Sequence, residues 1–418
     1  MRPLTHVQRM LPLAAVWIVL SFSIGSAQAQ SSSASDQNAK TNLNDPERQQ
    51  AMQLYEQHKL PEAAALLEKV VARYPEDVVA REALGASVLS RAATWNDPEK
   101  RKADRLRART ELLRAKELGD NSDLCKTLLA GIPEDGSEDA FSQNKEVEQA
   151  MQRGEAAFAQ GNFENAIQEY SHALAIDPKL YYAAVNIGDS YFRLKKGDDA
   201  GEWFARAIQI NPDEEVAYRY WGDSLVQEGK MKEARERFIG GLVANPYRQT
   251  SWNGLRNWLS QTHLSFRKII QIKLPDPPTV DAKGHINITV NTSTADKNDT
   301  SAAWLAYSMA KALWRSQKFA KEFPQEKKYR HSLKEEVDAL SMTANVFDEG
   351  HSNKAAKDPD LSLALLSELR AKAMLEPYIL FVLPDAGIAQ DYPAYKAANR
   401  EKLVQFIDEY ILPPTPQP

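Results

Sequence analysis

Small and apolar residues recur along the middle of the chain at spacings that favour packed helices. Four columns repeat every 34 residues between residues 147 and 246. A fixed period of about 20 to 50 residues indicates structural repeats, and apolar residues at every third or fourth position indicate helices. We therefore predict three helical hairpins. The columns are Gly154, Gly188 and Gly222; Ala166, Ala200 and Ala234; Tyr170, Phe204 and Phe238; and Pro178, Pro212 and Pro246.

Each column has a residue type that suits helix packing. Glycine and alanine mark places where two helices cross too closely for a large side chain, and the aromatic residue fills the space behind them. The proline ends one hairpin and starts the next, because the residue before a proline resists the helical conformation. Hairpins of this kind cannot bury their apolar faces alone, so they must stack into a solenoid.

The four columns resemble the tetratricopeptide repeat family. The resemblance implies a predominantly all-α solenoid, and a concave groove in which the first helix of each hairpin contacts a peptide or a partner's segment. In the family the residue after the glycine points into this groove, and here it is an acid in every repeat. The resemblance places these groove residues: Glu155, Asp189 and Asp223, with Phe158, Tyr182, Asn186, Phe192, Arg193, Arg219 and Gln227 around them.

The residues of this expected groove indicate its ligand. The basic residues with which chaperone-binding members hold a terminal carboxylate are not reproduced as a set, whereas Glu155, Asp189 and Asp223 form a line of negative charge. We expect an extended, basic or polar partner segment. Asn186 stands where the family often uses an asparagine to hold the bound backbone. The alternative for the acids is that they are only solvated helix residues.

The regions beside the regular repeats are also helical in pattern. Residues 45–132 reproduce the repeat spacing imperfectly, and we interpret them as degenerate hairpins. A polar linker at 133–146 precedes the regular array at 147–262. The array ends with a helix that has one apolar face, formed by Trp252, Leu255, Trp258 and Leu259. We expect this face to pack in the core or to cap the array; the alternative is that its aromatic residues form a platform for a ligand.

The pattern changes after the array. Ile270, Ile272 and Leu274 alternate with polar residues, and so do the apolar residues of 286–290, which predicts a small β-hairpin within 263–300. Residues 301–413 return to a helical pattern that resembles no family we recognise. The run YILFVLP from Tyr378 is too short to span a membrane and predicts buried core. The tail at 414–418 is expected to be disordered.

The first 29 residues have the pattern of a secretory signal peptide. Two arginines precede an apolar run, and Ala27-Gln28-Ala29 offers a cleavage site. The alternative is a retained membrane anchor, although the run is shorter than the ~20 residues that span a bilayer. We expect a flexible linker at 30–44 and an exported chain, periplasmic or secreted, without stable membrane insertion.

Charge restricts the classes of partner that we expect, and cysteine content restricts the disulfides that can form. The 418-residue chain has a formal net charge of −5, which argues against nucleic acid or anionic lipid as the main partner. Its single cysteine, Cys125, lies among leucines and cannot form an internal disulfide. We expect a buried thiol; the alternative is a thiol that pairs with another chain.

The sequence holds no recognisable catalytic signature. It lacks a G-x-S-x-G elbow, an H-E-x-x-H helix, a phosphate-binding loop and a cysteine cluster. We therefore predict a non-catalytic scaffold without cofactor or metal, which binds a protein or peptide and belongs to a cell-envelope complex. The competing hypothesis is that residues 263–412 form an enzyme or small-ligand domain to which the repeats recruit a substrate.

Overall fold

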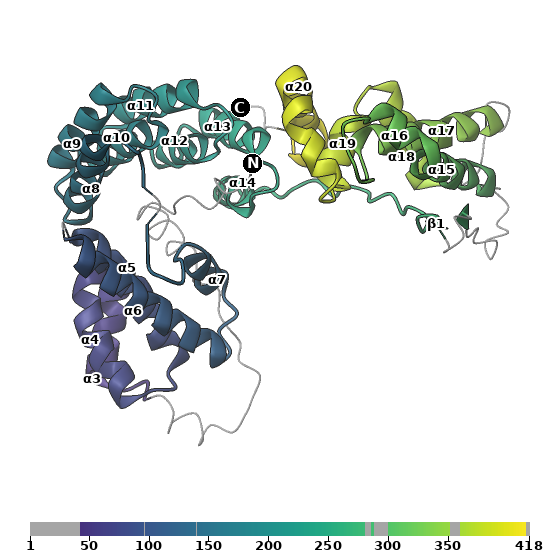
Figure 1. Cartoon of the computed structure of the whole chain (residues 1–418). Coiled ribbons are helices and arrows are strands. Elements are labelled where there is room, and N and C mark those ends of the chain that lie inside the picture. Colours follow the sequence, from purple (N-terminus) through teal and green to yellow (C-terminus); the bar gives the residue numbers. More distant parts are fainter. Residues whose placement is uncertain are drawn as a thin grey trace. The chain divides into compact units, whose positions relative to one another are not determined.

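The computed structural model describes residues 42–95, 97–138, 140–280, 286–287, 300–351 and 360–414. Two compact units make up the chain, Met1–Pro212 and Asp213–Pro418, called here unit 1 and unit 2. Both are built from helices (Figure 1). The predominantly helical fold class is confirmed.

Unit 1 is a succession of antiparallel helical hairpins. Each first helix packs on its own second helix, and α10 also packs on α9, so that consecutive regular hairpins stack. The helices are α3 (Pro46–Glu56), α4 (Leu60–Arg73), α5 (Val78–Thr94), α6 (Pro98–Glu117), α7 (Asp123–Ala130), α8 (Lys145–Ala159), α9 (Phe163–Ile176), α10 (Tyr181–Arg193) and α11 (Gly197–Ile210).

The glycine and aromatic columns meet as the sequence predicts. A Cβ atom placed on Gly188 would lie 2.7 Å from the ring of Phe204, and one on Gly222 would lie 2.5 Å from the ring of Phe238. Both rings are buried. Only a residue without a side chain allows this approach, so the columns record where the two helices of each hairpin cross.

Side-chain caps fix where several helices begin. The Asp45 carboxylate accepts a hydrogen bond from the backbone N–H of Arg48, and Pro46 follows it in the first turn of α3. Ser122 and Asn144 cap α7 and α8 in the same way. The first hairpins and α7 share one apolar core, in which the thiol of Cys125 is buried. The buried-thiol interpretation is confirmed, and burial raises the thiol's pKa to about 12.

Unit 2 begins with the third hairpin and continues to the C-terminal helices. Its elements are α12 (Val216–Gln227), α13 (Met231–Ala244), α14 (Gln249–Gln261), β1 (Thr279–Val280), β2 (Ile286–Asn287), α15 (Ser301–Leu313), η1 (Trp314–Lys318), α16 (Phe319–Glu322), α17 (Leu333–His351), α18 (Leu361–Ala371), α19 (Leu375–Val382), η2 (Ile388–Asp391), α20 (Tyr392–Phe406) and η3 (Ile407–Ile411).

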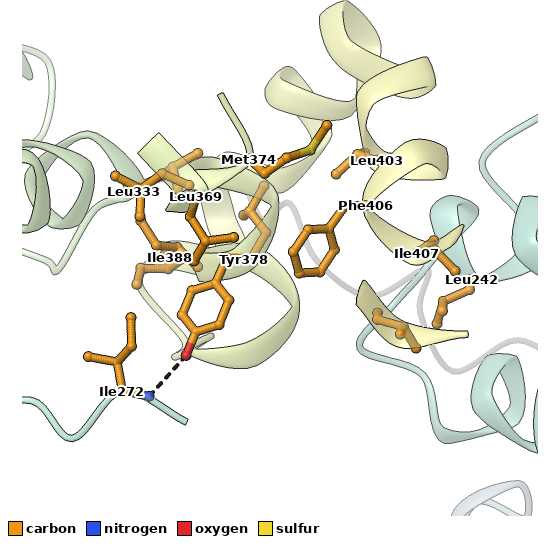
Figure 2. Close-up of a cluster of buried hydrophobic side chains, with 14 of the residues drawn as sticks. Leu242, Ile272, Leu333, Leu369, Met374, Tyr378, Ile388, Leu403, Phe406 and Ile407 are labelled. Carbon is orange, nitrogen blue, oxygen red and sulfur yellow. Dashed lines mark hydrogen bonds between the residues drawn. The ribbon is translucent and has the colours of Figure 1, made fainter. Parts of the chain in front are cut away.

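One apolar core joins the third hairpin to the C-terminal helices of unit 2. Leu242 of α13 belongs to the same buried cluster as Phe406 and Ile407 (Figure 2). Polar contacts support it, because the Tyr392 hydroxyl donates to the Val243 carbonyl at 2.7 Å. Trp258 of α14 is buried here too, so core packing is confirmed for the closing helix. The start of the YILFVLP run lies in α19 and is buried, as predicted.

The β-hairpin expected within 263–300 is not supported. Residues 270–274 form no strand, although Ile272 is buried, because the chain there docks on helices and not on another strand. Among the described residues the sheet pairing is limited to β1 with β2, where Thr279 lies opposite Asn287. Of the three alternating apolar residues only Ile272 is buried, whereas Ile270 is 41% exposed, so the alternation in this stretch does not mark a buried strand face.

Several expectations fall outside the described residues. These are the signal peptide at 1–29, nearly all of the linker at 30–44, the end of the strand expected at 286–290, and most of the tail. Within the residues that the structure describes, no helix combines the length and apolar character needed to cross a bilayer.

Candidate functional site

The predicted groove residues of unit 1 lie on α8 and α10, the first helices of neighbouring hairpins. They differ widely in exposure. Asp189 and Asn186 are buried, with 4% and 6% of their surface exposed, and Phe158 is buried as well. Half-buried members are Glu155, Tyr182, Phe192 and Arg193. We call these seven residues the first-helix surface of unit 1.

Glu155 and Asn186 join the two helices directly. The Asn186 side-chain amide donates to Glu155 Oε1 at 2.6 Å, and the Tyr170 hydroxyl donates to the same oxygen at 2.9 Å. Asn186, expected to hold a partner's backbone, thus contacts a neighbouring repeat here. Tyr170 is the aromatic column residue of its hairpin, so a packing residue also holds a carboxylate in place.

The environment of Glu155 changes its ionisation. Burial raises the pKa of this carboxyl to about 7, and the nearby carboxylates of Glu138 and Asp189 act in the same direction, while Arg101 opposes them. At neutral pH the carboxyl is therefore divided between its protonated and ionised forms. A cation brought close to this carboxyl would favour its ionised form.

Asp189 and Arg193 form a pair one helical turn apart. The Arg193 Nε atom lies 3.8 Å from Asp189 Oδ1, and the Arg193 guanidinium lies 6.0 Å from the centre of the Phe158 ring. Phe158 also contacts Phe163, with ring centres 5.2 Å apart. The charge of Asp189 is thus partly balanced within its own helix, and Phe158 is fixed by packing.

Three residues that influence this surface, Arg101, Glu138 and His58, were not predicted from the sequence. Arg101, 5% exposed, donates from Nη1 to Glu138 at 3.4 Å, and both influence the pKa of Glu155. The pKa of His58 is lowered by burial and by Arg193. These residues come from the irregular hairpins and the linker, which the repeat columns do not cover. The only sequence signal was the acidic linker beside an arginine-rich helix.

The predicted groove residues of unit 2 are Arg219, Asp223 and Gln227 on α12. Arg219 is buried, and its Nε donates to Glu215 at 3.1 Å. Although burial of Glu215 opposes the shift, Arg219, the Thr250 hydroxyl and Arg248 lower its pKa. Arg219 is therefore engaged within its own unit. Asp223 is half-buried and Gln227 is exposed.

A second cluster of charged side chains lies within the C-terminal helices. Lys311 of α15 stands 2.6 Å from Glu335 and 3.0 Å from Glu336 of α17, and both carboxylates are completely buried. His331 bridges Glu336 at 2.7 Å and Asp385 at 2.6 Å. Although burial of His331 acts the other way, its contacts with these two carboxylates raise its pKa.

This cluster is suited to hold helices together. Glu335 and Glu336 have no exposed surface and already contact the Lys311 cation, so removal of one partner would leave a buried charge without its counter-charge. No group of three or more histidine, cysteine, aspartate or glutamate side chains among the described residues is arranged to hold a metal ion.

Comparison with known proteins identifies the repeats. Residues 151–215 match the family model described as tetratricopeptide repeat. No curated protein matches the chain.

Solved structures of repeat proteins are similar to parts of the chain. The first repeat domain of Spaghetti (RPAP3) bound to the HSP90 peptide SRMEEVD is 24% identical, covers 29% of this chain and 98% of its own, and has a TM-score of 0.27. The Sgt2 repeat domain from Aspergillus fumigatus is 21% identical, covers 30% and 85%, and has a TM-score of 0.28. MamA is 19% identical, covers 47% and 94%, and has a TM-score of 0.24. The 34-residue columns, the helix crossings at the glycines and the match at 151–215 show that the chain contains tetratricopeptide repeats.

Proposed function

We propose that this protein is an exported, non-catalytic scaffold whose repeats bind an extended, basic or polar segment of a partner protein. One observation carries the proposal: two carboxylates, Glu155 and Asp189, lie on neighbouring first helices within reach of each other's charge. Burial holds the pKa of Glu155 at about 7. A cation that approaches this carboxyl favours its ionised form and thereby creates the negative charge that it binds. Aromatic side chains of the same surface offer apolar contact area.

Export and an envelope partner are part of the same proposal. The leader at 1–29 supports export, and its cleavage would give a chain that begins at Gln30. Mass spectrometry of the protein recovered from a cell-envelope fraction should find Gln30 as the first residue. A chain that keeps Met1 and stays in the cytoplasm would rule out export while leaving peptide binding open.

Binding can be tested with a defined probe. A fluorescein-labelled decapeptide that alternates lysine and valine should bind the chain from Gln30 onward in an anisotropy titration, and binding should weaken as salt is raised. The double variant Glu155→Gln, Asp189→Asn should weaken binding at least threefold and flatten the salt dependence. Amides are preferred to charge reversal because Asp189 is buried beside Arg193.

A control variant separates this surface from general attraction. Asp198→Asn and Asp199→Asn together remove the same number of charges from exposed positions at the start of α11. This control should bind the lysine peptide as the original chain does. Equal binding by the original chain and the Glu155→Gln, Asp189→Asn variant would refute the proposal.

A further inference from the structure

The imidazole of His331 lies between two carboxylates of unit 2. Its Nε2 atom is 2.7 Å from Glu336 Oε2 in the first turn of α17, and its Nδ1 atom is 2.6 Å from Asp385 Oδ2 in the turn after α19. Although burial opposes the shift, hydrogen bonds hold the pKa of both carboxyls below its ordinary value. An ionised carboxylate only accepts hydrogen bonds, and only the charged imidazolium donates from both ring nitrogens. The bridge therefore requires a protonated ring.

Charged groups from each neighbouring element surround this bridge. On α15, the Lys311 ammonium lies 3.0 Å from Glu336 and the Tyr307 hydroxyl donates to it at 2.9 Å. Burial of the ring and the Lys311 charge favour neutral His331, but the contacts with its two carboxylates outweigh them and raise its pKa. The remaining groups are engaged with one another or lie behind these contacts: Glu326, Tyr329 and Arg330 before α17, Glu335 on α17, Asp391 in η2, and Tyr247 between α13 and α14.

The two carboxylates differ in their access to water. The Glu336 side chain has no exposed surface, whereas 48% of the Asp385 side chain is exposed. A neutral imidazole has one N–H and can donate to only one of them. Loss of a donor costs more at a buried carboxylate than at an exposed one, because water cannot take the donor's place. The remaining proton therefore stays on Nε2, toward Glu336, and the Nδ1 lone pair faces Asp385.

Asp385 organises the turn that carries it. Its Oδ1 atom accepts from the backbone N–H groups of Gly387 and Ile388, both at 2.8 Å. Gly387 packs against the backbone of His331, because a Cβ atom placed on Gly387 would lie 2.3 Å from the His331 carbonyl oxygen. Arg330 also holds the Gly387 carbonyl, at 2.9 Å. A lone pair on Nδ1 repels the carboxylate, so deprotonation pushes the turn away from the ring while Arg330 limits how far it moves.

We propose that His331 is a pH-sensitive latch between the start of α17 and the turn at 384–388. The charged ring closes the latch by donating to Glu336 and Asp385, and the neutral ring keeps Glu336 and releases Asp385 to water. The stability that the latch contributes is complete below the pKa of a free histidine and is lost as pH rises through the higher pKa of His331 in the fold. The latch lies outside the repeats and does not depend on the binding proposed for them.

Hydrogen exchange of the peptide that spans residues 383–391 tests the latch in the chain from Gln30 onward. Exchange is measured by mass spectrometry at about pH 5.5 and about pH 8.5, on either side of the titration of histidine, and corrected for the intrinsic rate at each pH. The peptide should lose at least tenfold of its protection at the higher pH. In His331→Gln, which cannot become charged, protection should change less than twofold. Constant protection in the original chain would overturn the proposal.

Asp385→Asn separates the latch from a general loosening of unit 2. Asparagine keeps an oxygen for the N–H groups of the turn and offers an amide N–H to the Nδ1 lone pair of the neutral ring. The turn should then stay protected as pH rises. Asp360→Asn, the same change at the residue that caps α18, is the control and should keep the response of the original chain. A response that persists in Asp385→Asn would contradict the latch.

The position of the ring proton gives an independent measurement. Nitrogen-15 NMR of the His331 ring at about pH 8.5 should find the proton on Nε2, and a proton on Nδ1 would show that Asp385 is not the carboxylate released. Should His331→Gln lose its fold by circular dichroism, Asp385→Asn and the ring proton still decide. The exchange readout is confined to residues 383–391, so titration of Glu155 in unit 1 does not imitate it.

Discussion

The carboxyl of Glu155 makes the stability of the repeats depend on pH. Folding raises its pKa from 4.5 to about 7, chiefly by burial. Between these values the folded chain holds a proton that the unfolded chain has lost, so stability falls as pH rises through this window. Above pH 7 the ionised, half-buried carboxylate costs up to about 3 kcal/mol.

Glu155→Gln should remove this dependence. The amide keeps the oxygen that accepts from Tyr170 and Asn186 but cannot ionise. We expect the variant to be more stable than the original chain by about 1 to 3 kcal/mol at pH 8 and equal to it near pH 4.5. Urea unfolding at the two pH values measures this. Glu164→Gln, an exposed change on α9, is the control and should show little effect at either pH. A difference that does not vary with pH would contradict the assignment.

Gly188 tests the helix crossing. Gly188→Ala places a methyl group 2.7 Å from the buried ring of Phe204, and the enclosed ring has no space to move away. Overpacking of this kind costs about 1 to 3 kcal/mol. Gly350→Ala, on a helix position with nothing within 4 Å, should be neutral or stabilise by up to about 1 kcal/mol. Thermal unfolding of the two variants gives the comparison, and equal midpoints would show that the crossing is loose.

The sequence predicts the role of a residue where a packing constraint recurs at a fixed interval, and it misses residues outside that repeat. Gly188 and Phe204 were found because a packing constraint recurs at a fixed interval. Arg101 and His58 act near Glu155 and Arg193, but they lie on irregular hairpins, and no period connects them to the repeats. The burial of Asp189 could not be predicted from the repeat pattern either, because it depends on how α10 packs against the neighbouring helices.

At the scale of elements, α20 is attached to α13 by buried polar contacts. The Tyr392 hydroxyl donates to the Val243 carbonyl, and Lys396 donates to the Ala244 carbonyl at 2.7 Å. Both acceptors lie at the end of α13, whose last carbonyls have no partner within the helix. The C-terminal helix α20 thus completes the hydrogen bonding of the third hairpin.

Two tyrosines of α20 provide a matched test of this attachment. Tyr392→Phe should cost about 1 to 2 kcal/mol, because it leaves a buried carbonyl without its donor. Tyr395→Phe should be neutral or slightly stabilising, because the buried Tyr395 hydroxyl has no hydrogen-bond partner within the described ranges. Urea unfolding of the two variants measures the difference. Equal costs would mean that ring packing, and not the hydroxyl, attaches the helix.

The segment after α14 shows why an element can be misjudged from its pattern. Alternation at Ile270, Ile272 and Leu274 predicts a chain with one buried face; Ile272 is buried, but Ile270 is 41% exposed. The pattern does not say what covers that face. Here Tyr378, more than 100 residues away in sequence, supplies the hydrogen bonds that a second strand was expected to make.

At the scale of the whole molecule, the boundary between the two compact units does not coincide with the point where the repeat pattern ends. The pattern changes after residue 262, whereas the units meet at Pro212 and Asp213. The reason lies in the core of unit 2, where Leu242 and Trp258 are buried together with Phe406. A sequence period identifies repeated hairpins, but it cannot show that the last hairpin shares its core with helices that do not repeat.

This division predicts which fragment folds alone. A fragment of residues 213–418 keeps the whole core of unit 2 and should unfold in one cooperative urea transition with native near-ultraviolet circular dichroism. A fragment of 263–418 loses Phe238, Leu242 and Trp258, each worth about 2 to 5 kcal/mol when deleted from a core, which is comparable with the total stability of a domain. It should show no cooperative transition. Cooperative unfolding of the shorter fragment at the same urea midpoint would show that the C-terminal helices fold without the third hairpin, and that their shared core adds little stability.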